Sequence, residues 1–510
     1  GRYNWAFGRF LGTLALQYFV VGCIDSNFAA AMVQFIHIIM KLSKVLLAVA
    51  ALICAPAAFS QADSTASLTL DQCIAIALDS SPTIKVADME VSRMDYSRRE
   101  VIGQLLPTID FGATYNRMLA KQVMYMNMDF GSMGGGDGAE GDTPAPASDG
   151  AKKDNGIKMG LDNSFSLGFN ASLPLIAPQL WKSIAVSDAQ ILVSLEEARK
   201  SRQDLVNQVK NAYYTLLLAM DSKKVIQESY DMAALTYRTY SDQHAAGAAS
   251  DYDVLRTSVA MKNIEPELLQ ADVAVKQARL QLLILMGVDA TFRIVPATTL
   301  SDYERDMYAN TLALERDYSN NADLRLLDAN TDLLKRNLTV QKLAFAPTLA
   351  LAANYNWTSM SNGSPFSNFR WNPYSTIGLS LSVPIFQGGQ RVNRIKQAQI
   401  QVDQMQWQRT NLQRSIAMQV DLAIDNIKVN VQQIASCAES VGQAQQAYSI
   451  MDRSFDIGAA SYLDLRDSEL SLTRSRLAYY QAIYNYLVAN SDLELLLGTA
   501  PIESYQNTAL

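Results

Sequence analysis

The fold of this chain is indicated by a stretch that occurs twice, Leu105-Leu106-Pro107-Thr108-Ile109-Asp110-Phe111-Gly112-Ala113-Thr114-Tyr115-Asn116 and, 240 residues later, Phe345-Ala346-Pro347-Thr348-Leu349-Ala350-Leu351-Ala352-Ala353-Asn354-Tyr355-Asn356. After the proline, apolar or aromatic side chains alternate with small or polar ones. Such alternation over about ten residues predicts a β-strand with one apolar face and one polar face.

Three further motifs recur in the same order and indicate a tandem duplication. They are Ser172-Leu173-Pro174-Leu175 with Ser382-Val383-Pro384-Ile385, Gly247-Ala248-Ala249-Ser250 with Gly458-Ala459-Ala460-Ser461, and Leu285-Met286-Gly287 with Leu496-Leu497-Gly498. The first copy carries a longer loop, 118–162, rich in Gly, Asp and Ala. We therefore predict one mature domain, 63–510, made of two repeats at about 68–290 and 308–500.

The N-terminal 62 residues are predicted to lie outside this domain. Residues 40–62 have two lysines, a short apolar run and then small residues, which is typical of a signal peptide. A membrane helix is the alternative, but the run is shorter than the roughly 20 residues that a span needs. Residues 1–39 are interpreted as an upstream extension of the reading frame, with an N-terminal anchor as the alternative.

Four alternating strands are predicted, at about 106–116, 164–175, 347–357 and 374–385. Tilted transmembrane strands have this length and pattern. A soluble sandwich sheet with one wet face alternates too, but the aromatic residues near the strand ends favour the membrane: Tyr115, Trp357, Trp371 and Tyr374. Four strands cannot close a barrel, and open edges are not tolerated in lipid. Sister copies must therefore complete a barrel of 8 or 12 strands.

Long helices account for most of the remaining chain. Neither Gly nor Pro occurs after Pro178 as far as His244, and only Gly442 interrupts 390–457. About 67 helical residues span roughly 100 Å, and shorter helices at about 71–104 and 252–286 together match that length. Apolar positions from Ile416 to Phe455 step by four and three, which predicts coiled-coil contact. Cys437 and His244 lie on such stripes and are expected to be structural.

Charge and residue counts argue against several functions. The chain has 43 Lys+Arg against 50 Asp+Glu, a net charge of -7, which does not favour nucleic-acid binding. None of the four cysteines stands in a C-x-x-C pair, and there are two histidines. The glycine-rich stretch at 131–138 lacks the lysine and helix of a phosphate-binding loop. We predict no enzyme activity, no cofactor and no metal site.

The duplicated layout resembles the TolC family of outer-membrane efflux and secretion ducts. The most specific stretches are Ser382-Val383-Pro384-Ile385-Phe386-Gln387-Gly388-Gly389 and the twin turns at Gly247 and Gly458. The resemblance implies a homotrimer with a 12-stranded β-barrel in outer-membrane lipid and a long periplasmic α-barrel. It also implies docking to a periplasmic adaptor and an inner-membrane transporter, so that the duct conducts substrates passively in drug efflux, metal efflux or type I secretion. The alternative is a trimeric scaffold that anchors in the outer membrane but conducts nothing.

The resemblance also assigns candidate site residues. Acidic side chains at positions matching Asp464 and Asp467 form rings at the periplasmic entrance of the family, where they favour cations. The first-repeat equivalents are Asp253 and Arg256. A helix-dipole role for the acids is the alternative. Ala460 stands where the family has a closing arginine. The expected adaptor-contacting tips are Gly247, Ser250, Gly458 and Ser461, and the expected strand-to-helix transitions are Pro174, Pro384, Gly388 and Gly389.

Overall fold

The computed structural model describes residues 65–124, 157–304, 317–362 and 370–499. The predicted signal peptide and upstream extension lie outside the described residues, as does most of the loop at 118–162. The described ends of that loop form a short ladder between β3 (Gln122–Met124) and β4 (Ile157–Met159). Among the helices in these ranges, none combines the length and the apolar character needed to cross a membrane.

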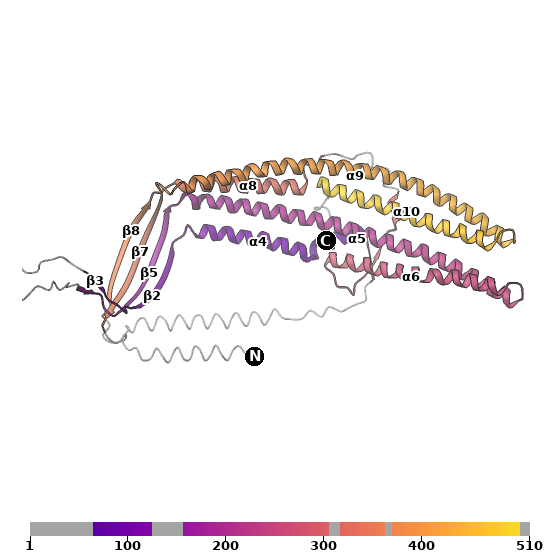
Figure 1. Ribbon diagram of the computed structural model, residues 1–510, viewed down its shortest axis with the longest axis horizontal. Helices are drawn as coiled ribbons and strands as arrows, with labels where there is room; N and C mark the ends of the chain where they lie inside the picture. The colour runs from indigo at the N-terminus through magenta and orange to yellow at the C-terminus, as the bar shows by residue number, and fades with distance from the viewer. Residues whose placement is uncertain (1–64, 125–156, 305–316, 363–369, 500–510) are drawn as a thin grey trace, which may run out of the picture. The chain divides into compact units, whose positions relative to one another are not determined.

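One antiparallel sheet joins the two repeats. Its order is β2 (Thr108–Arg117), β5 (Asn163–Ile176), β7 (Thr348–Ser361) and β8 (Asn372–Ser382), and β5 of the first repeat pairs with β7 of the second (Figure 1). Within the described residues, β2 and β8 each have one neighbour in this sheet. The sheet therefore has two unpaired edges. Together with the helices, it confirms a mostly helical chain with a small β part.

The pairing register of the four strands gives the sheet the apolar face and the polar face that the alternating sequence predicts. Phe111 lies opposite Phe169, which lies opposite Tyr355, whereas Asp110, Asn170, Asn354 and Thr376 form the adjacent row. Because successive side chains point to opposite faces, the first row belongs to an apolar face and the second to a polar face. Phe111 and Phe169 have ring centroids 5.0 Å apart, so aromatic contacts cross the strands on the apolar face.

Proline changes the strand ends from those predicted. β8 ends at Ser382 rather than near 385, because Pro384 has no N–H to donate to a ladder. In the first repeat, β5 continues through Pro174 to Ile176, and a register shift between those two residues accommodates the proline. Pro174 consequently lies inside a strand, and the transition to helix falls at Ala177 and Pro178 instead.

The two long helices begin at the sheet and end at distant turns (Figure 1). α5 (Pro178–Ala245) and α6 (Asp251–Met286) form one hairpin, and α9 (Gln390–Asp456) and α10 (Tyr462–Leu497) form the other. Shorter helices α4 (Pro82–Gly103) and α8 (Ala322–Lys342) pack along α5 nearer the sheet, and η5 (Leu343–Phe345) leads into β7. α9 thus contacts α8 and then α10 along its length, and α5 contacts α4 and α8 near the sheet and α6 and α10 further along.

The helix predicted over 71–104 is divided. α3 (Leu70–Ser80) ends before Ser81, whose ψ of 129° is extended, and α4 starts at Pro82. A proline disfavours helical backbone in the residue before it, which explains the break. α3 packs against α5 and α6. Its buried residues share a cluster with Ile294 of β6 (Arg293–Pro296), which pairs in parallel with β1 (Thr65–Leu68), and with Leu300 of η3 (Leu300–Tyr303).

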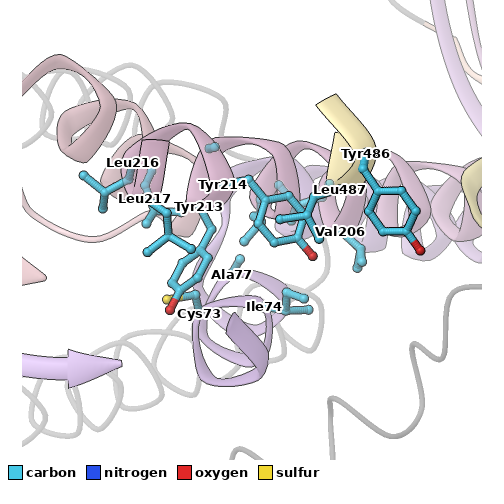
Figure 2. Close-up of a cluster of buried hydrophobic side chains, with 14 of the residues drawn as sticks. Cys73, Ile74, Ala77, Val206, Tyr213, Tyr214, Leu216, Leu217, Tyr486 and Leu487 are labelled. Carbon is cyan, nitrogen blue, oxygen red and sulfur yellow. The ribbon is translucent and has the colours of Figure 1, made fainter. Parts of the chain in front are cut away.

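The main core lies where α3 meets the middle of α5 (Figure 2). Cys73, Ile74 and Tyr213 are fully buried there, and the Tyr213 hydroxyl lies 3.2 Å from the Leu68 carbonyl oxygen, to which it donates. Burial raises the pKa of the Cys73 thiol to about 12, so the thiol stays protonated at neutral pH. Cys73 is therefore a packing residue.

The predicted coiled-coil stripe on α9 is inward-facing along its length. Ile416, Val420, Ile427 and Ile434 are buried, and Cys437 is half-buried. His244 does not pack in the stripe, because its ring is exposed at the end of α5, but its contacts to the turn are structural. At the last turn the helix runs out of packing partners, so the ring bonds to the turn instead of to a core.

Gly168 is expected to be required for the pairing of β5 with β7. A Cβ at this position would lie 1.7 Å from Asn356 Oδ1 and 2.9 Å from the Tyr355 carbonyl oxygen. Gly168→Ala should therefore cost about 1–3 kcal/mol through overpacking, measured as a lower thermal midpoint by circular dichroism in detergent. Gly112→Ala is the matched control, because Gly112 pairs with Gly168 and has open space. Equal midpoints for the two variants would contradict the assignment.

Candidate functional site

The two hairpin tips have nearly the same backbone. Gly247 has φ 76° and Gly458 has φ 73°, the left-handed region that favours glycine. The Gly247 amide donates to the His244 carbonyl at 2.8 Å, and the Gly458 amide donates to that of Phe455 at 2.9 Å. These bonds satisfy the last carbonyls of the long helices. Each hairpin therefore reverses direction without leaving the helix end open.

The serine after each turn caps the following helix. The Ser250 hydroxyl lies 2.6 Å from Asp253 Oδ2, and the Ser461 hydroxyl lies 2.6 Å from Asp464 Oδ2. Each hydroxyl also accepts the backbone N–H of its aspartate, at 3.2 and 3.3 Å. Asp464 additionally accepts the Ser461 N–H, completing a capping box. Both carboxylates are thus engaged in helix capping.

The Asp467 carboxylate, unlike that of Asp464, takes no part in a helix cap. Its side chain is exposed one turn further along α10. Within the part of the chain that the structure describes, no hydrogen bond or ion pair engages its carboxylate. The helix-capping interpretation therefore accounts for Asp464 but leaves the charge of Asp467 facing solvent.

Arg256 links the two hairpins through an aromatic ring. Its guanidinium carbon lies 4.8 Å from the centroid of Tyr462, a cation–π contact. Tyr462 in turn packs edge-on against Tyr240 at 5.9 Å, and Tyr240 lies 6.3 Å from Phe455. We name these four residues the tip cluster; they come from α6, α10, α5 and α9. Position 460 is an alanine in this chain, and the cationic contact between the hairpins comes from Arg256 instead.

Burial keeps the tip cluster uncharged on its aromatic side. It raises the pKa of the Tyr462 phenol, and burial together with the nearby Asp253 carboxylate raises that of Tyr240. Both phenols therefore remain neutral at physiological pH. Arg256 is therefore the charged member of the tip cluster, and its guanidinium contacts the neutral Tyr462 ring.

A buried ion pair lies about two turns from the second tip. Arg466 Nη1 and Glu469 Oε2 are 3.2 Å apart, and Glu469 is buried. The Ser229 hydroxyl of α5 donates to Glu469 Oε1 at 2.9 Å. Separating a buried charge from its partners is strongly destabilising, because the charge is then buried without compensation. This triad therefore favours one register of α10 against α5. Arg476 reaches Glu228 of α5 at 2.8 Å further along.

His244 closes the first tip. Its Nδ1 lies 3.0 Å from the Ala249 carbonyl oxygen, and its Nε2 lies 3.1 Å from Asp251 Oδ1. Both partners are acceptors, so both bonds form together when each ring nitrogen carries a proton. The second tip has Phe455 at the matching position, inside the tip cluster.

The sequence brought out the tip glycines, serines and acids, but not the residues that join the hairpins. Tyr240, Tyr462, Ser229 and Glu469 carry no motif, because their role depends on α5 lying beside α10. Tyr240 stands four residues before His244 on α5, and this packing-stripe spacing is the signal that could have found it. No comparable signal marked Glu469. In the described ranges, no group of three or more His, Cys, Asp or Glu side chains is placed to hold a metal ion.

The strand-to-helix transition of the second repeat uses two glycines. Gly388 and Gly389 have φ of 57° and 77°, and Gly389 precedes the first residue of α9. Arg391 donates through Nη1 to the Ala344 carbonyl at 2.5 Å. The first repeat uses Pro178 at the first helical position instead. The two transitions therefore differ in chemistry despite their common motif.

A four-stranded antiparallel sheet with two unpaired edges, joined to two long helical hairpins, is the architecture of one protomer of a channel protein. The family model described as "Outer membrane efflux protein" matches residues 73–288 and 314–499, one match in each repeat. The chain belongs to the outer membrane efflux protein family, and it is an outer-membrane protein.

Individual relatives agree with this assignment. Outer membrane protein TolC of Escherichia coli K12 is 23% identical over 372 residues, covering 69% of this chain and 72% of TolC. The cobalt-zinc-cadmium resistance protein CzcC of Cupriavidus metallidurans is 24% identical over 300 residues, covering 58% of this chain and 68% of CzcC. The crystal structure of the Campylobacter jejuni CmeC outer membrane channel superposes with a TM-score of 0.61 at 17% identity, covering 86% and 90% of the two chains.

Arg256→Gln is expected to loosen the tips. The change removes a cation–π contact worth about 0.5–1 kcal/mol, which corresponds to about two- to fivefold faster local opening. Hydrogen exchange followed by mass spectrometry should register this increase at 246–250 and 457–461. Arg238→Gln, at an exposed position on α5, is the control and should leave both segments unchanged. Unaltered exchange at 457–461 in Arg256→Gln would show that the contact does not hold the tips.

Proposed function

We propose that three copies of this chain form a passive exit duct, with a 12-stranded barrel in the outer membrane and a helical tunnel in the periplasm. The observation that carries the proposal is the four-stranded sheet with unpaired edges at β2 and β8. Lipid offers no hydrogen-bond partners, so those edges must be paired. Three copies supply twelve strands. Because β2 runs away from the helices and β8 runs back to them, the free edges of two copies meet antiparallel.

An apolar stripe on α6 supports assembly of the helices. Its large side chains are exposed at steps of three, four or their sums: Tyr252, Leu255, Val259, Leu269, Val273, Leu280 and Ile284. Such a stripe is a coiled-coil seam without a partner in a single chain. A neighbouring copy in a closed tunnel would cover it.

The duct performs no chemistry of its own in this proposal. Its energy comes from an inner-membrane transporter, and a periplasmic adaptor contacts the tips around Gly247, Ser250, Gly458 and Ser461. These segments are solvent-exposed or half-exposed, and their rigid caps present a defined surface. CzcC is named for resistance to metal ions, whereas other relatives are named for pyoverdine export and protease secretion. The cargo of this chain accordingly depends on the transporter that it joins.

Asp467 is the residue proposed to set ion preference at the entrance. Three copies would bring three Asp467 and three Asp464 carboxylates around one axis, which favours cations. Since Asp464 is held by its cap and Asp467 is free, Asp467 is expected to contribute more. At the matching positions of the first repeat, Asp253 is acidic and Arg256 is basic.

Conductance in a planar bilayer tests the proposal. Purified protein should give cation-selective channels, and Asp467→Asn should lower the cation-to-anion permeability ratio without lowering the thermal midpoint. Asp464→Asn should lower the ratio and also weaken the cap by about 0.5–1 kcal/mol. Asp403→Asn is the control, because Asp403 is exposed near the sheet end of α9.

The outcomes separate the two candidate functions. A well-folded protein that never conducts would support an outer-membrane scaffold instead of a duct. Channels whose selectivity is unchanged in both tip variants would leave the duct intact but remove the acidic entrance.

A further inference from the structure

Two large apolar side chains project from the short segment between β8 and α9. Ile385 is 91% exposed and Phe386 is 85% exposed. They border a cavity of about 210 Å³ whose other walls are Phe345, Pro384, Gln387, Gly389, Gln390, Arg391 and Val392. Adjacent large apolar residues exposed to this degree are unusual on the surface of a complete assembly, and they mark an interaction site. We name residues 383–387 the β8–α9 strap.

The strap is held in place although its side chains are free. Gly388 and Gly389, both left-handed, reverse the chain into α9. Arg391 anchors the other side, since its guanidinium donates to the Ala344 carbonyl and lies 5.9 Å from the Phe345 ring. The backbone is therefore fixed while Ile385 and Phe386 point away from their own chain. Such preorganisation lowers the entropic cost of docking.

The first repeat shows that this exposure is a matter of position. Leu175 and Ile176, which match Ile385 and Phe386, are 40% and 43% exposed. β5 is an inner strand flanked by β2 and β7, and Ile176 pairs with Leu349. β8 is an edge strand. Neighbouring strands of the same chain partly cover Leu175 and Ile176. The strap has a neighbouring strand on one side only, so a second chain has to cover it.

The free edges determine which part of a second copy reaches the strap. β8 ends at Ser382 on the helix side of the sheet, and β2 begins at Thr108 on that same side. Antiparallel pairing of the two edges puts these ends at one level. The residues just before β2 of the second copy then lie beside the strap, and they include Leu105 and Leu106, the latter 59% exposed.

We infer that Ile385 and Phe386 of one copy dock against Leu105 and Leu106 of the next, and that this contact seals the joint where strands pass into helices. The inference rests on the proposed trimer and names the contact that closes it. A ladder cannot seal this level, because β8 has ended and Pro384 has no N–H. Lipid is a poorer occupant, because Gln387, Gln390 and the charged Arg391 line the same cavity and are costly in hydrocarbon.

A disulfide between copies tests the contact directly. The full chain carrying Phe386→Cys and Leu106→Cys, with Cys23, Cys54 and Cys437 changed to Ser and the buried Cys73 kept, is oxidised in detergent and run on a denaturing gel. Cross-linked dimers and trimers are expected. The matched control pairs Leu106→Cys with Ile176→Cys, the first-repeat counterpart. Because β2 and β5 are neighbours in one chain, that pair should give no cross-links between copies.

A second variant measures the strength of the seal. Ile385→Ser with Phe386→Ser should lower the trimer association constant by at least about tenfold, since burial of one large apolar side chain is worth about that factor or more. Leu119→Ser, exposed beyond the far end of β2, should leave it unchanged. Native mass spectrometry of wild type and both variants gives the trimer fraction.

The results distinguish failure of this inference from failure of the duct. Wild-type trimers without cross-links at 106 and 386, and with undiminished association in the serine variant, would overturn the docking and assign the strap to lipid. A wild type that is monomeric in detergent and in lipid nanodiscs would instead overturn the proposed trimer itself.

Discussion

Unpaired backbone groups on two sheet edges are the constraint on which the rest of this structure depends. β2 and β8 each leave one row of N–H and C=O groups without a partner in the described sheet, and an outer-membrane protein cannot present such rows to lipid. This constraint is the reason for the proposal that the chain is one sector of a larger cylinder. The exposed stripe on α6 and the exposed strap beside β8 meet the same requirement in side-chain terms, because each is apolar surface that a single copy leaves uncovered.

The two halves of the chain have a similar layout, yet their environments are unequal. The tips are nearly identical, with matching glycine dihedrals and serine caps, because those contacts are local to each turn. The strand-to-helix transitions have diverged, with Pro178 starting one long helix and two glycines preceding the other. An inner strand and an edge strand make different demands on the residues that follow them. Local contacts were conserved between the halves where neighbours are equivalent, and they differ where neighbours are not.

At the tips, the helix caps and the contacts between the two hairpins stabilise different parts of the structure. Ser250 and Ser461 stabilise the individual helix starts, whereas the tip cluster and the Arg466–Glu469–Ser229 triad connect one hairpin to the other. The cation–π contact is near the surface and is worth little by itself, so it can be broken without unfolding either hairpin. The buried triad is costlier to disrupt. Movement of the hairpin ends is therefore easier than movement of the helices behind them.

Sequence alone determined the features that depend on local periodicity: the four strands, the long helices, the two turns and the family resemblance. It also predicted that one chain cannot close its own sheet. It misplaced the strand ends near Pro174 and Pro384, because how far a strand continues past a proline depends on its pairing partners. The break at Ser81 was also missed, although Pro82 is a local signal for it. Tertiary structure decided that β5 pairs with β7, that Arg256 reaches Tyr462 and that Glu469 is buried beside Ser229. Those contacts join residues more than 170 positions apart, and only the packing of the two halves of the chain brings such residues within bonding distance.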